Sequence, residues 1–305
     1  MQTISEFDES FGTEEGCKRF IIEMRWPNGV ACPRCNRTTG VYALKARPYN
    51  WACKNKDCGG RNGYRFSVIT HTIFENTKIA LPIWFKIGYL VLTSKKGMSA
   101  LQIHRIIFGE HSSHAYHTSW YLVMRWRAAM RGDMYQPLTG VIEVDEMYHG
   151  GKEKNKHRSK RQYLGTGGVG KVAVIGAIAR KGNVVARVVE NTDTATLDGF
   201  VRRVVDKDKV ELIATDEYRP YHALGYGDEP LPHDTVNHGK GEYVRGIVHT
   251  QNIESFWSLF KRGVMGSYHH VSKEYLPLYL NEFSWRFNNR NNPNAFADLI
   301  QGVGK

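Results

Sequence analysis

The sequence lacks any long hydrophobic run. Its longest apolar stretch, Ile79–Leu92, is shorter than the roughly 20 residues that span a bilayer, and Lys86 interrupts it. The first residues of the chain also lack the basic and apolar segments of a secretory leader. These absences argue against a membrane or secreted protein, so we expect a soluble, cytoplasmic chain.

Acidic residues are in the minority. The 305 residues include 30 Asp and Glu against 42 Lys and Arg, which gives a formal net charge of +12. Such an excess favours a polyanionic partner, because each cation placed on a phosphate releases condensed counterions. Charge alone does not decide this, since many basic proteins bind no nucleic acid. The length suits two or three domains.

Cysteine is scarce, but its spacing is specific. Four of the five cysteines form two short pairs, Cys32-Pro-Arg-Cys35 and Cys53-Lys-Asn-Lys-Asp-Cys58. In a cytoplasmic protein this spacing is typical of a four-cysteine zinc ribbon holding one structural Zn²⁺, and not of disulfides. Cys17 lies outside the cluster on a predicted helix, where we expect a small buried hydrophobe.

We expect the ribbon within a first domain of residues 1–77. The apolar spacing of Thr13–Arg25 predicts a helix before it. Turn residues separate short strand-like segments at Val41–Leu44, Tyr49–Ala52 and Tyr64–Ile69, the turns including Gly40, Gly59, Gly60 and Gly63.

A second domain, residues 78–132, is expected to be helical. Its apolar spacing predicts helices at Leu81–Leu92, Ser99–Ile107 and Ser113–Met130. A short helix, a turn and a longer basic helix fit a helix-turn-helix, with Arg125 and Arg127 as candidate DNA contacts. An ordinary three-helix bundle fits the same spacing.

The pattern changes to α/β in a third domain, residues 133–305. Three strands, a helix and a fourth strand are predicted at Val141–Val144, Val172–Ala179, Val184–Val189, Thr194–Val205 and Glu211–Thr215. This order is typical of an RNase H-like layer, followed by further helices. In that architecture the first and fourth strands lie side by side.

Three carboxylates stand at the ends of these elements. Asp145 and Asp216 each follow a strand-like run, and Glu254 opens a predicted helix that also carries Lys261. Two strand-end carboxylates and one from a helix can hold a pair of Mg²⁺ (or Mn²⁺) ions about 4 Å apart, the arrangement used for in-line displacement at phosphorus. Aspartate after a strand is more often part of a turn. That interpretation is weaker here, because all three carboxylates occur in a basic chain suited to nucleic acid.

Neighbouring residues compete for these roles. Glu254 and Lys261 are separated by about 20° around a helix, so a metal ligand and a phosphate-binding lysine share one face. Asn252 precedes the run and fits a helix N-cap better. By strand alternation Glu143 shares the face of Asp145 and could assist, whereas the side chains of Glu146 and Glu217 are expected to point away.

Two glycine-rich segments follow the first strand. Gly150–Arg161 is predicted to be a flexible basic loop, exposed to solvent and placed to cover DNA. Gly165-Thr-Gly-Gly-Val-Gly-Lys171 imitates a phosphate-binding loop, but Val172 replaces the required Ser or Thr and a strand follows instead of a helix. We therefore reject nucleotide binding there.

Together these motifs resemble a known family. The sequence is similar to bacterial insertion-sequence transposases of the DDE class, in the ISXO-like group related to Merlin elements. The stretches that carry the resemblance are Trp26–Cys35, Ser94–His104, Val141–Tyr148, Thr215–Tyr218, His249–Gly263 and Tyr268–Val271.

The resemblance implies an RNase H-like domain with Asp145, Asp216 and Glu254 as the acidic triad. Some relatives carry Asn as the third member, so Asn252 remains a rival. His249 and Lys261 would hold phosphates. The implied partners are double-stranded DNA, both terminal inverted repeats and target, and further copies of the chain on that DNA.

Two other classes remain open. A non-catalytic DNA-binding regulator would use the ribbon and the helix-turn-helix alone. A structure-specific Mg²⁺-dependent nuclease would cleave DNA without joining it. Whether the ribbon contacts DNA or another protomer also stays open, because four-cysteine ribbons do both.

Overall fold

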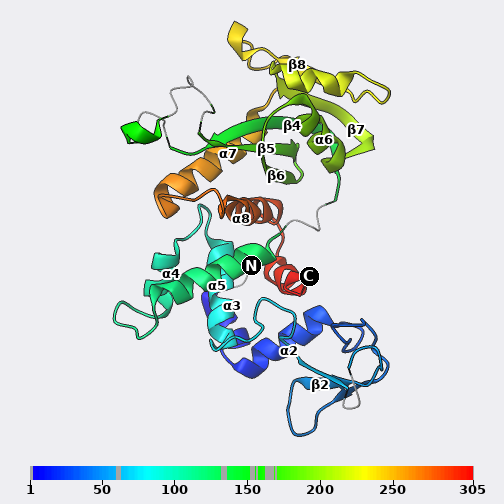
Figure 1. Ribbon diagram of the computed structural model, residues 1–305, viewed down its shortest axis with the longest axis vertical. Coiled ribbons are helices and arrows are strands. Elements are labelled where there is room, and N and C mark those ends of the chain that lie inside the picture. The colour runs from blue at the N-terminus through cyan, green and yellow to red at the C-terminus, as the bar shows by residue number, and fades with distance from the viewer. Residues whose placement is uncertain are drawn as a thin grey trace. The chain divides into compact units, whose positions relative to one another are not determined.

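The computed structural model describes residues 3–59, 63–131, 136–151, 155, 157–161, 168 and 170–304 (Figure 1). The chain forms two compact units, residues 1–130 with 291–305, and residues 131–290. The sequence predicts three domains, one more than the two units seen here, and that division stays a prediction. Its boundary between residues 132 and 133 lies outside the described residues. In the described chain, no helix is both long and apolar enough to cross a membrane.

The first unit combines helices with a small antiparallel sheet. Its sheet has the order β1-β2-β3. The elements are α1 Ile4–Phe11, α2 Glu14–Arg25, β1 Val41–Ala43, β2 Asn50–Cys53, β3 Tyr64–Ser67, α3 Leu81–Thr93, α4 Ala100–Ile107, α5 Tyr116–Ala129 and α9 Ala295–Gly302. The three helices predicted between residues 81 and 130 are present. The helix α1 was not anticipated; it begins with a capping box between Thr3 and Glu6.

Aromatic side chains form much of this unit's helical core. Rings from α1, α2, α3 and α9 meet within 6.3 Å of one another, among them Phe7, Phe11, Phe20, Phe85 and Phe296. The last helix, α9, therefore packs with the N-terminal helices, although sequence analysis assigned residues 291–305 to the third domain.

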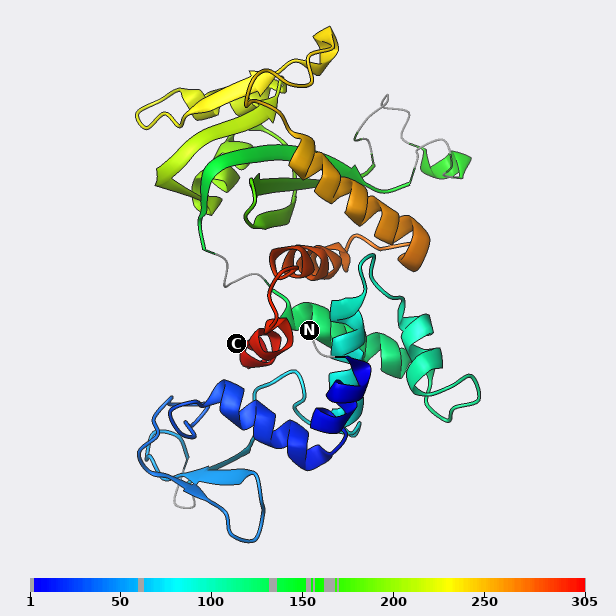
Figure 2. The same cartoon turned by 180° about the vertical axis from the view of Figure 1, so that it is seen from behind.

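The second unit is a five-stranded mixed sheet of order β6-β5-β4-β7-β8 (Figures 1 and 2). Its elements are β4 Leu138–His149, β5 Val172–Ala179, β6 Val184–Val189, α6 Thr194–Val204, β7 Val205–Asp216, η3 Arg219–Gly225, β8 His233–Val236, α7 Gln251–Gly263, η5 Val264–Tyr268 and α8 Leu276–Asn288. The predicted α/β class is confirmed, with helices and a small antiparallel sheet earlier in the chain.

The two faces of this sheet are covered by different helices. On one face, α6 packs Leu197, Val201 and Val204 into a core with the strands and with Tyr221 of η3. On the other, α7 lies so close that a Cβ added to Gly176 of β5 would sit 2.5 Å from the Trp257 ring. The helices α7 and α8 contact each other through aromatic pairs, and α8 reaches β6 (Figure 2).

The pairing of β4 with β7 places the ends of these two strands side by side. The two strands are parallel neighbours, which confirms the prediction that the first and fourth strands of this domain are adjacent. The strand β8, His233–Val236, was not predicted, because four mostly polar residues give no strand signal.

The two glycine-rich segments are only partly described. Most of residues 152–156 and 162–169 lie outside the described residues, and so does Gly60 of the ribbon. β5 begins at Val172, directly after Lys171, so the segment that imitates a phosphate loop leads into a strand.

Candidate active site and zinc centre

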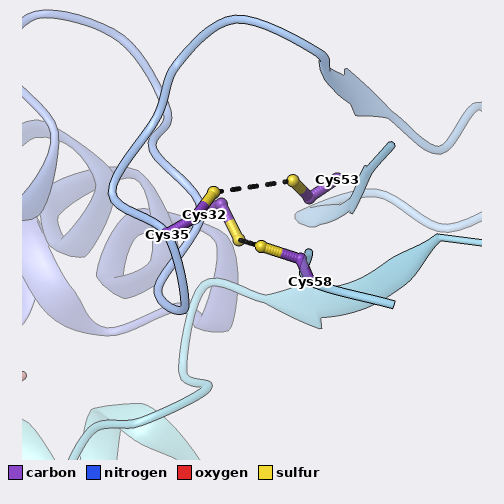
Figure 3. Close-up of side chains that lie close together, drawn as sticks. All are labelled: Cys32, Cys35, Cys53 and Cys58. Carbon is purple, nitrogen blue, oxygen red and sulfur yellow. Dashed lines mark hydrogen bonds between the residues drawn. The ribbon is translucent and has the colours of Figure 1, made fainter. Parts of the chain in front are cut away.

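The four clustered cysteines converge on one point (Figure 3). Their sulfur atoms all lie within 4.8 Å of one another, with Cys32 and Cys58 3.8 Å apart and Cys35 and Cys53 3.9 Å apart. A tetrahedral Zn²⁺ with Zn–S bonds of about 2.3 Å separates its sulfurs by about 3.8 Å. The geometry and the soft donor set therefore fit zinc.

Electrostatics in the cluster also favour a cation. Hydrogen bonds from the backbone of Arg37 and from the Cys58 thiol lower the pKa of Cys35 to about 6, so this residue holds the thiolate. The pKa of Cys58 is raised, first by its hydrogen bond to Cys35 and then by burial. Aromatic and aliphatic side chains, including Trp51 and Phe66, pack around the sulfurs and complete the small core.

Asp145 and Asp216 lie at one end of the second unit's sheet. β4 and β7 run in parallel with Glu143 opposite Ala214, so continuing the register by two residues brings Asp145 opposite Asp216. Neighbouring strands are about 4.8 Å apart, and residues opposite each other point to the same face. Both aspartates are half-buried.

Glu254 reaches this face from α7. It lies in the first turn of the helix, is exposed, and accepts a 2.7 Å hydrogen bond from the Thr250 hydroxyl. Asp145 pairs across β4 and β5 with Gly176, the residue on which Trp257 of α7 packs. α7 thus covers the strand next to Asp145.

The carboxylates are close enough to repel one another. The pKa of Asp145 is raised to about 8, first by burial and then by the negative charges of Glu146, Asp216 and Glu254. A divalent cation would relieve this repulsion, and carboxylate oxygens are the donors that Mg²⁺ and Mn²⁺ prefer. Within the described part of the chain, however, only the four cysteines have ligand atoms already gathered as a metal site. Cation binding at the carboxylates therefore requires their side chains to turn toward one another.

A fully buried glutamate attaches α7 to the sheet. The Glu143 carboxylate accepts hydrogen bonds from the backbone N–H groups of Asn252 (2.7 Å) and Ile253 (3.2 Å) and from the Asn252 side chain (2.7 Å). Arg180 Nε donates to it at 2.8 Å, and His249 Nδ1 lies 3.2 Å away. The first N–H groups of a helix lack partners within the helix and carry partial positive charge, so a buried carboxylate stabilises them strongly.

This arrangement revises two expectations. Asn252 is not the N-cap of α7, because the helix begins at Gln251 and Thr250 precedes it. Instead, Asn252 and His249 both contact Glu143 and help to set the start of the helix. Strand alternation predicts for Glu143 only an assisting role. Its hydrogen bonds to the start of α7 join residues more than 100 positions apart, so the sequence carries no local signal for them.

Comparison with known proteins gives the family. The model of the ISXO2-like transposase domain matches residues 137–288, and that of the transposase zinc-ribbon domain matches residues 12–61. An uncharacterized transposase-like protein of Haemophilus influenzae is 32% identical over 116 residues, which cover 38% of this chain and 89% of the relative. The chain belongs to the ISXO2-like transposase family.

A second relative agrees with this assignment over most of the chain. An uncharacterized protein in transposable element ISH50 of Halobacterium salinarum is 28% identical over 288 residues, covering 91% of this transposase and 92% of the relative. Among solved structures, a simian T-cell lymphotropic virus intasome in complex with PP2A regulatory subunit B56 gamma matches weakly, with a TM-score of 0.29, 10% identity, and coverage of 66% and 65%.

The family matches coincide with the observed elements. The transposase domain begins one residue before β4 and ends with α8, and the ribbon match contains all four clustered cysteines. The resemblance read from the sequence motifs is therefore confirmed. Zinc in the ribbon of this transposase is supported by the family match and by the cysteine geometry.

Other candidate residues take varied positions in the transposase. Lys261 is exposed on α7. The Glu146 carboxylate accepts a 2.8 Å hydrogen bond from buried Tyr221, and Glu217 accepts one of 2.9 Å from the Gly239 N–H, so each has a partner of its own. Burial raises the pKa of Glu146.

The two arginines expected as DNA contacts both make hydrogen bonds within the protein. Arg127 is 1% exposed and donates to Met124 Sδ, so its guanidinium does not reach the surface. Arg125 is half-buried and donates to the carbonyls of Thr72 and Ile73. The burial of Arg127 corrects its assignment as a DNA contact. The assignment of Arg125, whose guanidinium is held by backbone carbonyls but is still partly exposed, stays a prediction.

Zinc removal tests the first site. We expect one Zn²⁺ per chain by elemental analysis, and its loss in Cys53→Ser, because three thiolates do not complete the tetrahedron. Cys17→Ala is the matched control, since Cys17 is buried against Phe11 away from the cluster, and should keep its zinc. Equal zinc content in wild type and Cys53→Ser would contradict the assignment.

The pKa of Asp145 predicts a pH-dependent stability. Because its folded pKa of about 8 exceeds its ordinary value of 3.8, the stability that Asp145 contributes is complete below about pH 4 and is lost as the pH rises to about 8. The Asp145→Asn variant keeps this stability at all pH values, because the amide does not ionise. In thermal melts without divalent cations, the variant should exceed wild type by several degrees at pH 8, and by less at pH 5. A gap that is constant with pH would show that Asp145 is not crowded.

Proposed function

We propose that this transposase cleaves the ends of its element and joins the freed 3′-hydroxyl to target DNA at one site built from Asp145, Asp216 and Glu254. The observation that carries the proposal is geometric: the β4–β7 register brings Asp145 opposite Asp216, and α7, which packs on the strand next to Asp145, carries Glu254 in its first turn. The raised pKa of Asp145, caused by burial and then by the neighbouring carboxylates, agrees with this arrangement. A protein tolerates such crowding where function needs it, and perturbed acids cluster at active sites.

The proposed ligands are hard oxygen donors that fit two Mg²⁺ or Mn²⁺ ions. When bound, such ions lower the pKa of an attacking water and stabilise the leaving 3′-oxygen. Asp145, at the end of β4, would lose its proton when it binds a metal ion. Asp216, from the neighbouring strand β7, would be the second ligand. Glu254 would turn from Thr250 toward the sheet. Lys261, exposed on the same stripe of α7, would bind a phosphate of the strand being cut.

Glu254 is favoured over Asn252 as the third ligand. The backbone N–H and the side-chain amide of Asn252 both donate to Glu143, whereas the Glu254 carboxylate is exposed and accepts a hydrogen bond from the Thr250 hydroxyl. We assign Asn252 and His249 to positioning α7.

Double-stranded DNA is the proposed partner, both as terminal repeats and as target. The net charge of +12 supports a polyanion. The ribbon (within residues 1–77) and the helices of residues 78–132 would contribute DNA or protomer contacts, with the catalytic domain in residues 133–305. Two ends must be handled together, so we propose a homo-oligomer on DNA.

The test is cleavage of DNA from the boundary of the chain's own element. With Mg²⁺, wild type should nick the duplex and then join the 3′-end to a second duplex. Asp145→Asn, Asp216→Asn and Glu254→Gln should each lower the rate by at least about a hundredfold, because each removes transition-state stabilisation of several kcal/mol.

Asp208→Asn provides the matched control, because Asp208 is an exposed aspartate on the same strand as Asp216. It should cleave like wild type. Binding without any cleavage would support a non-catalytic regulator, and cleavage without joining would support a nuclease.

A further inference from the structure

The loop between β8 and α7, residues 237–250, exposes apolar side chains. Tyr243, Val244 and Ile247 are 62%, 48% and 63% exposed. Single exposed apolar residues are common on proteins, but three within five positions form a patch. In Figures 1 and 2 the loop is the yellow-to-orange segment leading into the orange helix α7.

The tip of this loop is held rigidly. Arg245 and Val248 exchange backbone hydrogen bonds of 2.9 and 3.0 Å, and Ile247 lies in the turn that they close. The Arg245 guanidinium donates to the Thr235 carbonyl at 2.8 Å and forms an ion pair with Asp234, both on β8. Val248 is buried. The turn is therefore fixed to the sheet while Ile247 projects into solvent.

Both ends of the loop adjoin the proposed active site. Near its start, the Gly239 N–H donates to Glu217, the residue after Asp216. At its end, the Thr250 hydroxyl donates to Glu254. A DNA strand bound at these carboxylates would therefore lie close to both ends of the loop.

We propose that this loop inserts its apolar tip between base pairs next to the scissile phosphate. The inference rests on the proposed function. Val244 and Ile247 cannot hydrogen-bond to phosphates, so within DNA their matching surface is the face of a base. Apolar wedges of this kind unstack and kink a duplex, which frees one strand to approach a recessed site. Exposed Lys240 in the loop and exposed Lys261 on α7 supply positive charge for the phosphate backbone of the DNA.

The test compares two duplexes from the element's boundary in Mg²⁺. One is fully paired, and the other carries mismatches beside the scissile phosphate. Ile247→Ser and Val244→Ser should each cleave the paired duplex about tenfold or more slowly than wild type, because unstacking then lacks its wedge. The mismatched duplex, which is already unstacked, should restore both variants to near the wild-type rate.

Tyr226→Ser is the control, because Tyr226 is 73% exposed but lies outside the loop. It should match wild type on both duplexes. Unchanged rates for both loop variants, or losses that mismatches do not relieve, would overturn the proposal. So would weakened self-association of Ile247→Ser in sedimentation with normal cleavage, which would assign the patch to a protomer interface. If wild type cleaves neither duplex, the proposed function itself fails.

Discussion

Helix α7 is attached to the sheet through the buried carboxylate of Glu143, and the proposed site depends on this attachment. Two backbone N–H groups, an asparagine amide and an arginine all donate to one side chain that has no exposure to solvent. A buried charge is tolerated only with such compensation. Since Glu143 lies two residues from Asp145, the same strand that supplies one candidate ligand also sets the start of the helix that supplies another.

The carboxylates of the proposed site, unlike Glu143, destabilise the folded protein when they are charged. Burial and the neighbouring charges raise the pKa of Asp145 to about 8, so the metal-free protein holds an acid in an unfavourable setting. Glu143 is satisfied by its partners, whereas Asp145 is crowded by like charges. A rigid frame around a strained group is the general design of preorganised sites, in which the frame supplies the stability that the site gives up. The zinc ribbon combines three short strands with a cysteine cluster. Small domains bury little apolar surface, and in such domains a structural metal commonly supplies part of the folding free energy.

Periodicity and strand order predicted much of this from the sequence. The bounds of β5 and β6 agree with their apolar runs, and the adjacency of the strands bearing Asp145 and Asp216 follows from their order in an α/β sheet. The cysteine spacing predicted the zinc cluster, because chelation requires those short intervals. The assignment of the three carboxylates as metal ligands stays a prediction.

What the sequence could not supply comes from contacts between distant residues. The role of Glu143 depends on partners more than 100 positions away, and a glutamate in a strand has no signature of burial. The inward orientation of Arg127 was hidden because basic residues on a helix usually face solvent. β8 is short and polar, and its neighbour β7 determines that it pairs at all.

Manganese binding to wild type and Glu143→Gln tests the central claim most directly. Mn²⁺ titrations followed by electron paramagnetic resonance should give two bound ions in wild type. The affinity should fall by about 10- to 100-fold in Glu143→Gln, the usual effect of losing a residue that orients metal ligands. Circular dichroism of the variant should retain the sheet and helices. Equal Mn²⁺ affinity in the two folded proteins would contradict the account, because Glu143 would then not control where the third carboxylate lies.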